Sequence, residues 1–344
     1  PDGVWETTTT LDIGFDWTLW NKLTVNFDWY DMTTTDMLYR LTLPGTGGSA
    51  DFPYQNVGEM NNKGIDLGIN YNGASASGEF TYDIGFNISQ YKNEIVKLSD
   101  NAAEGFFGDD RRQEVYTRNE AGIPYSSFYG YIVDGFTDGS EPESAFPTYY
   151  GRAGRFKYRD LDGDNVITDQ DRTFIGNPHP DFTYGLNFNA NYKNFDFALF
   201  LMGSQGNDLT NYVSRWTDFW MFQGNRSKKM RYESWTPELG DAAKLPIASA
   251  NDNISARPST YFVEDGSFMR LKNLQVGYTV PNLQGIDRLR IYVQATNLFT
   301  ITNYSGLDPE VNIQETWGNE ANLGFDEGYY PTSQQFLIGV NFGF

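Results

Sequence analysis

The sequence contains no cysteine and a single histidine, and its charge is strongly one-sided. Without cysteine there is no disulfide framework, no thiolate metal site and no cysteine nucleophile. One histidine leaves little material for a histidine metal cluster or a nucleophile–histidine pair. Lys and Arg number 25 against 45 Asp and Glu, which gives a net charge of −20. Because that charge repels phosphate groups, we expect no nucleic-acid partner.

Long apolar runs are also missing. The strongest one covers residues 197–202, far short of the roughly 18–20 residues that a membrane helix needs. Aromatic residues, in contrast, make up 17% of the chain, and there are 35 glycines. This composition excludes helical membrane spans but is compatible with a membrane β-barrel, whose alternating strands give a weak hydropathy signal.

Apolar and polar residues alternate over long stretches of the chain. Many of the alternating segments approach the roughly 9–11 residues that a tilted strand needs to cross a bilayer, whereas soluble strands usually have about 5–6. The polar side includes acids that a dry core would not accept unpaired. The pattern therefore predicts an all-β protein, a transmembrane antiparallel β-barrel with its apolar face in lipid and its polar face toward a watery lumen. The segments are 11–19, 23–29, 65–71, 80–88, 182–188, 195–201, 274–280, 289–295 and 336–344.

Short and long connections alternate between these segments. The short turns are 20–22, 73–78, 193–194 and 281–287, and the long segments are 33–62, 93–181, 204–267 and 300–332. Outer-membrane barrels have short periplasmic turns and long extracellular loops, so we expect Phe344 in the periplasm and residues 1–8 outside. That arrangement needs an odd number of strands, but a closed bacterial single-chain barrel has an even number. We therefore expect residues 1–344 to be the C-terminal portion of a larger barrel.

One acidic stretch, residues 160–171, stands out within the long segment 93–181. Counted from Asp160, acids occupy positions 1, 3, 5 and 12, a spacing that wraps oxygen ligands around a hard cation. Asn165 replaces the usual glycine at position 6 and tolerates the left-handed conformation needed there. We expect a structural calcium site that stiffens an extracellular loop; the alternative is a hydrated acidic loop without an ion. The expected ligands are Asp160, Asp162, Asp164, the Val166 carbonyl, Thr168 and Asp171.

Aromatic residues fall into two groups, one near the strand ends and one in the long segments. In a barrel, the first group would form girdles at the membrane interfaces. The second group could pack the loops together, contact a partner or bind a ligand. The strand-end group is Trp17, Trp29, Tyr30, Tyr71, Tyr91, Tyr192 and Tyr278, and the loop group is Tyr125, Phe128, Tyr129, Tyr131, Trp216, Phe219, Trp220 and Trp235.

Nothing in the sequence predicts catalysis. His179 lies between two prolines, which favours a structural role in a rigid turn. There is no Gly-rich phosphate loop, no G-x-S-x-G elbow and no H-E-x-x-H motif. A carboxylate pair of the glycosidase type stays open among so many acids, although no spacing points to one. We therefore expect a protein that is not an enzyme.

Several stretches spread over the chain resemble one family, the SusC/RagA-type TonB-dependent outer-membrane transporters of Bacteroidota. Together they are similar to the C-terminal half of the family's barrel domain, in agreement with the strand parity. The matching stretches are Trp5–Asp16, Asn56–Asp66, Asp171–Pro178, Phe268–Leu274, Val276–Pro281 and Tyr292–Phe299, with the terminal Phe344.

The resemblance implies a barrel of 22 strands, of which this chain would supply about nine to twelve, closed by an N-terminal plug. It implies import of a glycan or peptide with a SusD-like surface lipoprotein, energised by TonB–ExbB–ExbD acting through the plug. Partners would then be this lipoprotein, the N-terminal plug and barrel half, and outer-membrane lipid. It also assigns Gly339, Phe342 and Phe344 to a barrel insertion signal.

Two other functions stay open at this point. The first is a passive porin-like or structural barrel, which a plug with a TonB box would exclude. The second is a secreted calcium-binding protein that acts on carbohydrate. The second requires a soluble protein, in which the apolar rows would pack against each other in a dry interior.

Overall fold

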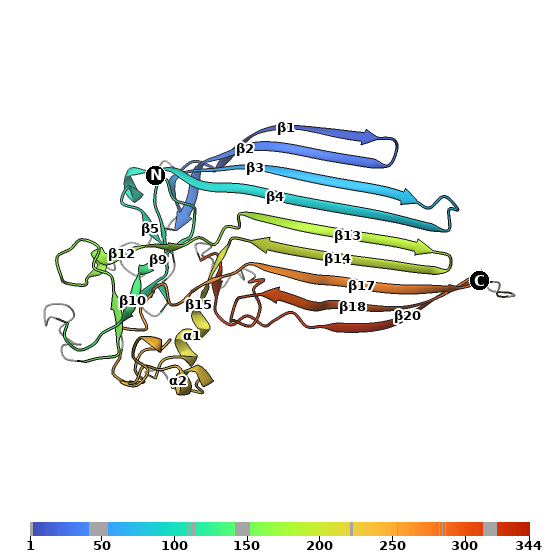
Figure 1. Cartoon of the computed structure of the whole chain (residues 1–344). Coiled ribbons are helices and arrows are strands. Elements are labelled where there is room, and N and C mark those ends of the chain that lie inside the picture. Colours follow the sequence, from blue (N-terminus) through green and yellow to red (C-terminus); the bar gives the residue numbers. More distant parts are fainter. Residues whose placement is uncertain are drawn as a thin grey trace.

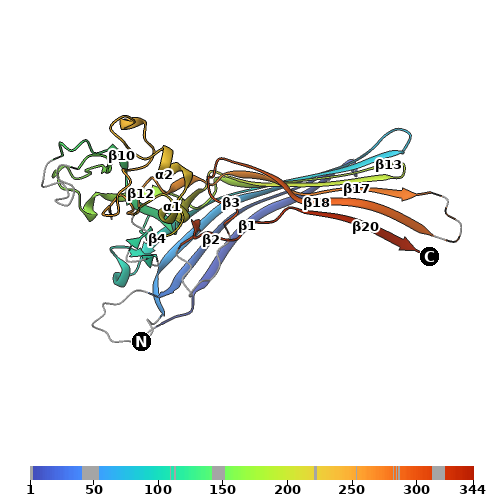
Figure 2. The same ribbon diagram turned by 90° about the horizontal axis from the view of Figure 1, so that it is seen from below.

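In the computed structural model, nine antiparallel strands form one continuous curved sheet (Figures 1 and 2). The structure describes residues 3–40, 54–108, 110–111, 114–141, 152–220, 223–252, 254–281, 283, 285, 287–311 and 322–344. In spatial order the strands are β1 (Thr7–Leu19), β2 (Leu23–Arg40), β3 (Tyr54–Ala74), β4 (Phe80–Leu98), β13 (Phe182–Tyr192), β14 (Phe195–Gln205), β17 (Phe268–Val280), β18 (Arg288–Thr302) and β20 (Gln335–Gly343).

The pairing register joins the apolar positions of all nine strands into continuous rows on one face. One such row runs from β1 to β20 through Leu19, Leu23, Tyr71, Ile84, Phe188, Leu199, Leu274, Ala295 and Phe336. The opposite face carries polar rows. One of these runs through Asp16, Asn26, Gly68, Asn87, Gly185, Met202, Arg270 and Thr300.

The apolar rows are exposed. Phe15 is 53% exposed, Val293 52% and Ile338 79%. Since exposing such side chains to water is costly, an apolar sheet face of this extent fits a lipid surface. The expectation for a soluble protein, apolar rows packed against each other, is wrong for the described strands. Two hollows lie against the polar face of the sheet.

No helix among the described residues is long and apolar enough to cross a membrane.

The strand count and the arrangement of the ends agree with the sequence-based prediction. The sheet has nine strands, and the turns at 20–22 and 193–194 are tight as expected. Asn21 and Lys193 reach positive φ angles of 53° and 53° there. The first described residues lie at the end with the long loops, and Phe344 lies at the hairpin end (Figure 1). The turn expected at 281–287 lies partly outside the described residues.

The strands β2, β3 and β4 are longer than predicted. They contain 18, 21 and 19 residues, so much of the loop expected at 33–62 is strand, and β4 continues six residues beyond Lys92. The alternation ends early because these strands project past the apolar rows, where neither face needs apolar side chains. Polar pairs hold them together there; for example, the Asn93 amide of β4 donates to the Asn62 side-chain oxygen of β3 at 2.8 Å. Residues 41–53 lie outside the described part.

The dry core lies in the loop assembly at the long-loop end, beyond the sheet (Figures 1 and 2). It is built mainly of aromatic side chains, including Tyr131, Phe156, Phe219 and Phe262. Among the loop aromatics, Phe128, Tyr129, Tyr131 and Phe219 are buried and pack the loops together, whereas Trp220 is 53% exposed. Burial of these rings makes the assembly a folded body rather than separate loops.

Short elements make up this loop assembly. The strands are β5 (Phe106–Phe107), β6 (Asp110–Arg111), β7 (Glu114–Val115), β8 (Thr117–Asn119), β9 (Ser127–Tyr131), β10 (Val133–Phe136), β11 (Phe156–Tyr158), β12 (Arg172–Gly176), β15 (Asp208–Asn211), β16 (Val263–Asp265) and β19 (Phe325–Asp326). The helices are α1 (Tyr212–Thr217) and α2 (Lys228–Tyr232), with 3-10 turns at Asp100–Ala102, Asp169–Asp171 and Gly240–Ala242.

Two of the expected girdle residues have another role. Tyr30 and Tyr91 face the polar side, since Tyr30 pairs with Gly64 and Gly64 pairs with Tyr91. Alternation alone placed them near strand ends, but their register puts them in the row that also contains Asp12. The girdle interpretation is therefore wrong for these two residues.

Tyrosine rings lie over glycines on neighbouring strands at several points of the sheet. A Cβ atom on Gly339 would lie 2.2 Å from the Cζ atom of Tyr292, its cross-strand partner. Such a pair lets the ring cover backbone that glycine leaves bare. The other pairs of this kind are Tyr30 with Gly64, Tyr82 with Gly73 and Tyr184 with Gly203.

Gly339→Ala is expected to destabilise the sheet by about 1–3 kcal/mol, because the added methyl group displaces the Tyr292 ring. Gly343→Ala on the same strand is the control, since its Cβ would have no neighbour closer than 3.7 Å. Urea unfolding of the full-length protein in lipid vesicles gives both values. Equal stability of the two variants would contradict the ring-over-glycine interpretation, and Tyr292→Ala should relieve the cost of Gly339→Ala.

Candidate functional site

The polar face of the sheet forms the first candidate site. A hollow of about 540 Å³ lies against it, lined among others by Asn26, Asp28, Asp66, Asn87 and Thr183. The Ser89 hydroxyl donates a hydrogen bond to Asp66, and the Asn26 amide donates to Asp16. Because these side chains are hydrophilic and mostly uncharged or acidic, this wall can border water and a polar solute.

The acidic loop brings three of its expected ligands together. Carboxylate oxygens of Asp160, Asp162 and Asp164 lie within 4.8 Å of one another, the one group of three or more possible metal ligands found among the described residues. Asp160 accepts hydrogen bonds from the Gly163 and Asn165 N–H groups at 2.7 and 2.8 Å. Asn165 has φ 64°, the left-handed conformation predicted for position 6. The loop therefore has the turn that curls carboxylates around a common centre.

Two of the remaining expected ligands, Asp171 and Thr168, are used within the loop itself. Asp171 is fully buried and accepts hydrogen bonds from the Leu161 and Thr168 N–H groups at 2.8 and 2.6 Å. The Thr168 hydroxyl accepts from the Gln170 N–H at 3.1 Å and caps the following 3-10 turn. The Val166 N–H donates to Asp164 at 2.7 Å. These bonds close the loop around the three clustered carboxylates, of which Asp162 and Asp164 are exposed and Asp160 is half-buried.

Electrostatics within the cluster favour a cation. A hydrogen bond from the Asp164 N–H lowers the pKa of Asp162, but desolvation and the nearby carboxylates of Asp164, Asp171 and Asp160 outweigh it, so the pKa is raised. Carboxylate oxygens are hard donors of the kind that calcium prefers. The donor set therefore fits calcium chemically.

His179 has a structural role, as predicted from its two flanking prolines. Its Nδ1 atom lies 3.0 Å from the Tyr91 hydroxyl and its Nε2 atom 2.8 Å from the Tyr125 carbonyl. Burial lowers the pKa of His179 and so favours the neutral ring. Through its two ring nitrogens, His179 thus connects the segment just before β13 with β4 and with the loop that contains Tyr125.

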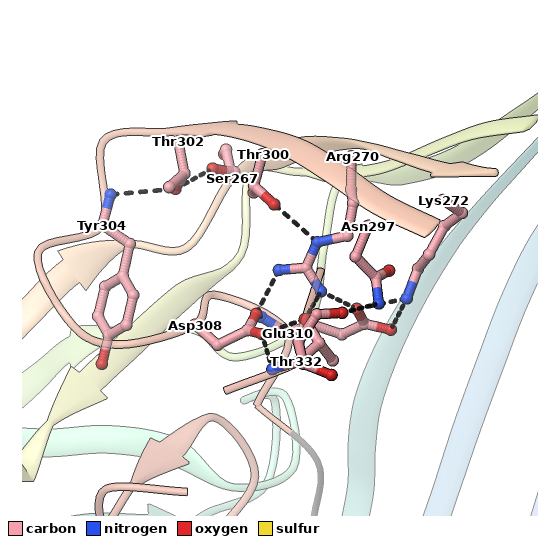
Figure 3. A network of polar contacts seen from close by, with 11 residues as sticks. Ser267, Arg270, Lys272, Asn297, Thr300, Thr302, Tyr304, Asp308, Glu310 and Thr332 are labelled. Carbon is pink, nitrogen blue, oxygen red and sulfur yellow. Dashed lines mark hydrogen bonds and ion pairs between the residues drawn. The ribbon is translucent and has the colours of Figure 1, made fainter. Parts of the chain in front are cut away.

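A network centred on Arg270 fastens the last long loop to the polar face (Figure 3). The Arg270 side chain, 3% exposed, donates to Asp308 at 2.5 Å and to Glu310 at 2.6 Å. It also donates to the Thr300 and Thr332 hydroxyls, both at 2.8 Å. A single buried guanidinium therefore joins β17, β18 and both ends of the loop between β18 and β20.

Lys272 adds a second cation to the network. Its ammonium group lies 2.9 and 2.7 Å from the two carboxylate oxygens of Glu310. The register of β17 shifts between Leu271 and Asn273, and this bulge falls at Lys272. A β-bulge adds one residue to a strand and so changes which face the following side chains point to. Here it allows Leu271 and Leu274, three positions apart, to lie in apolar rows on the same face.

Asp308 is held ionised by this network. Burial alone would raise its pKa, but hydrogen bonds from Arg270, Thr332 and the Glu310 N–H outweigh burial and lower the pKa from 3.8 to about 2. A carboxyl group with a lowered pKa in the folded protein contributes stability that is fully present above its unfolded value. That stability is lost as the pH falls through the folded value.

The last loop is therefore expected to stay attached above pH 4 and to loosen between pH 4 and about 2. Pepsin, which works in this range, should cleave residues 303–311 and 322–334 increasingly fast as the pH is lowered. In an Asp308→Asn variant the loop should be cleaved readily at pH 4 already. If the cleavage rate of this variant depends on pH in the same way as that of the native protein, a group other than Asp308 controls the attachment of the loop.

The sequence did not reveal the Arg270 network. Arg270 and Lys272 fall within the stretch Phe268–Leu274 that carries the family resemblance, but nothing assigned them a partner. A buried arginine on a strand needs acids nearby. Asp308 and Glu310 lie 38 and 40 residues away in the chain from Arg270, among 45 acids, so spacing could not identify them.

Comparison with known proteins gives consistent matches over nearly the whole chain. The sequence model of the family described as "TonB dependent receptor-like, beta-barrel" matches residues 3–298. TonB-dependent receptor P3 of Formosa agariphila is 35% identical over 99% of this chain and 34% of its own length. TonB-dependent receptor SusC of Bacteroides thetaiotaomicron is 30% identical over 99% of this chain and 32% of its own length. The chain thus spans about a third of these relatives.

Solved structures of the RagAB peptide importer share the fold. In the 'closed-closed' state, the match has a TM-score of 0.77 and 25% identity, covering 100% of this chain and 36% of that chain. In the 'open-open' state, the TM-score is 0.74 and the identity 26%, covering 100% and 35%. This chain thus covers about a third of the RagAB chain that it matches.

Proposed function

Because this chain belongs to the TonB-dependent receptor-like β-barrel family, we propose that it forms part of the wall of an active outer-membrane importer. The observation that carries the proposal is the nine-stranded sheet with one exposed apolar face and one polar face, in a chain that spans about a third of its relatives. The apolar face meets outer-membrane lipid, and the polar face borders the path of the solute. No bond is made or broken by these residues.

The remaining parts of the importer lie outside this chain. The N-terminal half supplies further strands and a plug, through which TonB–ExbB–ExbD act, and a SusD-like surface lipoprotein delivers a bulky nutrient. RagAB is a peptide importer, and the likeness to it supports peptide as one nutrient class; glycan is the other. In this arrangement the long loops face outward and Phe344 faces the periplasm. Gly339, Phe342 and Phe344 act as the insertion signal.

Two measurements on the full-length protein test this function. Purified from detergent-extracted outer membranes, it should carry a surface lipoprotein in equal amount. In a planar lipid bilayer without TonB it should show no steady conductance, because a plug closes the barrel. A protein that purifies alone and conducts steadily would instead be a passive porin-like barrel.

Calcium at the loop 160–171 is a second part of the proposal. Asp160, Asp162 and Asp164 supply carboxylate oxygens. The motif also assigns the Val166 carbonyl, Thr168 and Asp171 as ligands, and of these Thr168 and Asp171 accept hydrogen bonds within the loop in this structure. The ion neutralises carboxylates that otherwise repel each other and stiffens the loop beside β12. Its role is structural.

Calcium is expected to protect this loop from proteolysis. At a concentration 100 times Kd, binding adds about 2.7 kcal/mol, which slows cleavage through local opening by up to about a hundredfold. An Asp162→Asn, Asp164→Asn double variant should lose the difference between calcium and chelator. Asp241→Asn, an exposed acid elsewhere in the loop assembly, should keep it. Identical digestion of the native protein with calcium and with chelator would refute the calcium site.

A further inference from the structure

A short basic segment includes helix α2, in the loop between β14 and β17. Four of the six residues from Arg226 to Arg231 are basic and none is acidic. Over the whole chain, in contrast, acids outnumber bases by 45 to 25. Lys228, Lys229 and Arg231 are exposed on α2. This segment therefore reverses the local sign of the charge on the surface of the loop assembly.

The cations of α2 have no close counter-charge. Within the described part of the chain, none of Lys228, Lys229 and Arg231 forms an ion pair. Glu233, which directly follows the helix, pairs instead with Lys244 at 3.6 Å. The positive charge of the segment is therefore open to an acidic partner.

Two aromatic rings next to these cations are exposed. Trp220 is 53% exposed and Tyr232 65%. The Arg226 guanidinium lies 5.7 Å from the centre of the Trp220 ring, and the Arg231 guanidinium lies 5.4 Å from the centre of the Tyr232 ring. Trp, Tyr and Arg are the residue types that most often anchor protein–protein interfaces. This composition therefore favours a protein surface as the ligand over a small ion.

The segment is fixed on the loop assembly before any partner binds. The Arg226 side chain donates to the Trp220 carbonyl at 3.1 Å, which holds the two residues together. The Ser227 N–H donates to the Thr217 carbonyl at 2.9 Å and so ties the start of α2 to the end of α1. Met230 is buried and anchors α2 from below. A surface that is already ordered loses less conformational entropy when a partner docks.

Helix α2 lies in the loop assembly, beyond the long-loop end of the sheet (Figure 1). We propose that residues 226–232, together with Trp220, form a docking surface for an acidic face of the surface lipoprotein. The proposal rests on the proposed function, which requires such a partner at this end of the barrel. Opposite charges steer two proteins together and set their relative orientation. Lipid headgroups fit less well, because the lipid-facing rows belong to the sheet.

Charge reversal in the full-length protein, purified with its lipoprotein, tests the proposal. Lys228→Glu combined with Arg231→Glu should lower the amount of lipoprotein retained at physiological salt by about tenfold or more, because like charges then oppose each other. Arg152→Glu combined with Lys157→Glu makes the same charge change at two other exposed bases of the loop assembly and should leave retention unchanged. Gel mobility with and without heating verifies that each barrel is folded. Equal retention in the two double variants would overturn the proposal.

The aromatic anchor has a matched control of its own. Trp220→Ala should lower retention of the lipoprotein by about tenfold, because removal of a central tryptophan commonly costs that much at an interface. Trp20 is 78% exposed in the turn between β1 and β2, at the opposite end of the sheet, and Trp20→Ala should leave retention unchanged. Retention that is unchanged in Trp220→Ala would also overturn the proposal.

Photo-crosslinking identifies what covers the surface. A benzophenone amino acid at Tyr232 should form cross-links to an acidic segment of the lipoprotein, and their yield should fall as salt is added, because exposed charges are screened. Cross-links to a second copy of this chain or to lipid, or none at all, would overturn the proposal while leaving TonB-dependent import intact. A native protein that purifies without any lipoprotein would overturn the proposed partner and this inference together.

Discussion

Arg270→Ala is expected to release the last long loop from the polar face. Arg270 is buried with Asp308 and Glu310 as partners, and its removal leaves two neighbouring carboxylates without their shared cation. Loss of one partner of a buried ion pair costs about 3–5 kcal/mol. Backbone amides of residues 303–311 and 322–334 should therefore exchange hydrogen at least about a hundredfold faster. Hydrogen exchange of the full-length protein, followed by mass spectrometry, measures this.

Lys272→Ala is the matched control for this variant. Lys272 is 22% exposed and contacts only Glu310 in the network, and Glu310 keeps its bond to Arg270 when Lys272 is removed. A partly exposed pair contributes about 1 kcal/mol, less than a tenfold change in exchange. If both variants loosen the loop equally, Arg270 is not the centre of the attachment.

Val293→Arg is expected to destabilise the barrel far more than Gln294→Arg, although the residues are neighbours. Val293 lies in an apolar row between Val276 and Ile338, whereas Gln294 lies in a polar row and donates to Asn273 at 2.8 Å. An arginine facing the middle of a bilayer costs about 2–4 kcal/mol, and one facing a watery lumen costs little. At position 294, the loss is about 1 kcal/mol for one hydrogen bond.

Urea unfolding of full-length protein in lipid vesicles compares these two free energies. The comparison tests which face meets lipid, since the two variants introduce the same charge in adjacent positions of one strand. If Gln294→Arg were the more damaging variant, the orientation of the sheet would be reversed.

The acidic loop and the Arg270 network differ in how far they could be predicted. Residues 160–171 are consecutive, so their spacing alone placed Asp160, Asp162 and Asp164 around one turn, and Asn165 took the left-handed conformation expected of it. The partners of Arg270 come from a different part of the chain. Their meeting depends on how the loop folds back on the sheet, which no local pattern records.

The strand ends illustrate the same limit. Alternation is visible where one face meets lipid, so the nine strands and their apolar rows followed from local order. Beyond the lipid, nothing requires apolar and polar residues to alternate. The sequence therefore predicts loop for the outer parts of β2, β3 and β4, although cross-strand pairing continues through them in the structure. Tyr91 was misread for this reason, since its register with Gly64 turns it to the polar side.

Local sequence order was thus sufficient for the fold class, the number of strands and the two-sided character of the wall, because a bilayer imposes a period of two on each strand separately. Folding in three dimensions was needed to bring Arg270 to Asp308, to place Tyr292 over Gly339, and to gather Lys193, Arg288 and Arg290 around one hollow. These contacts join residues far apart in the chain. Register and loop packing select them, since each side chain by itself is compatible with many partners.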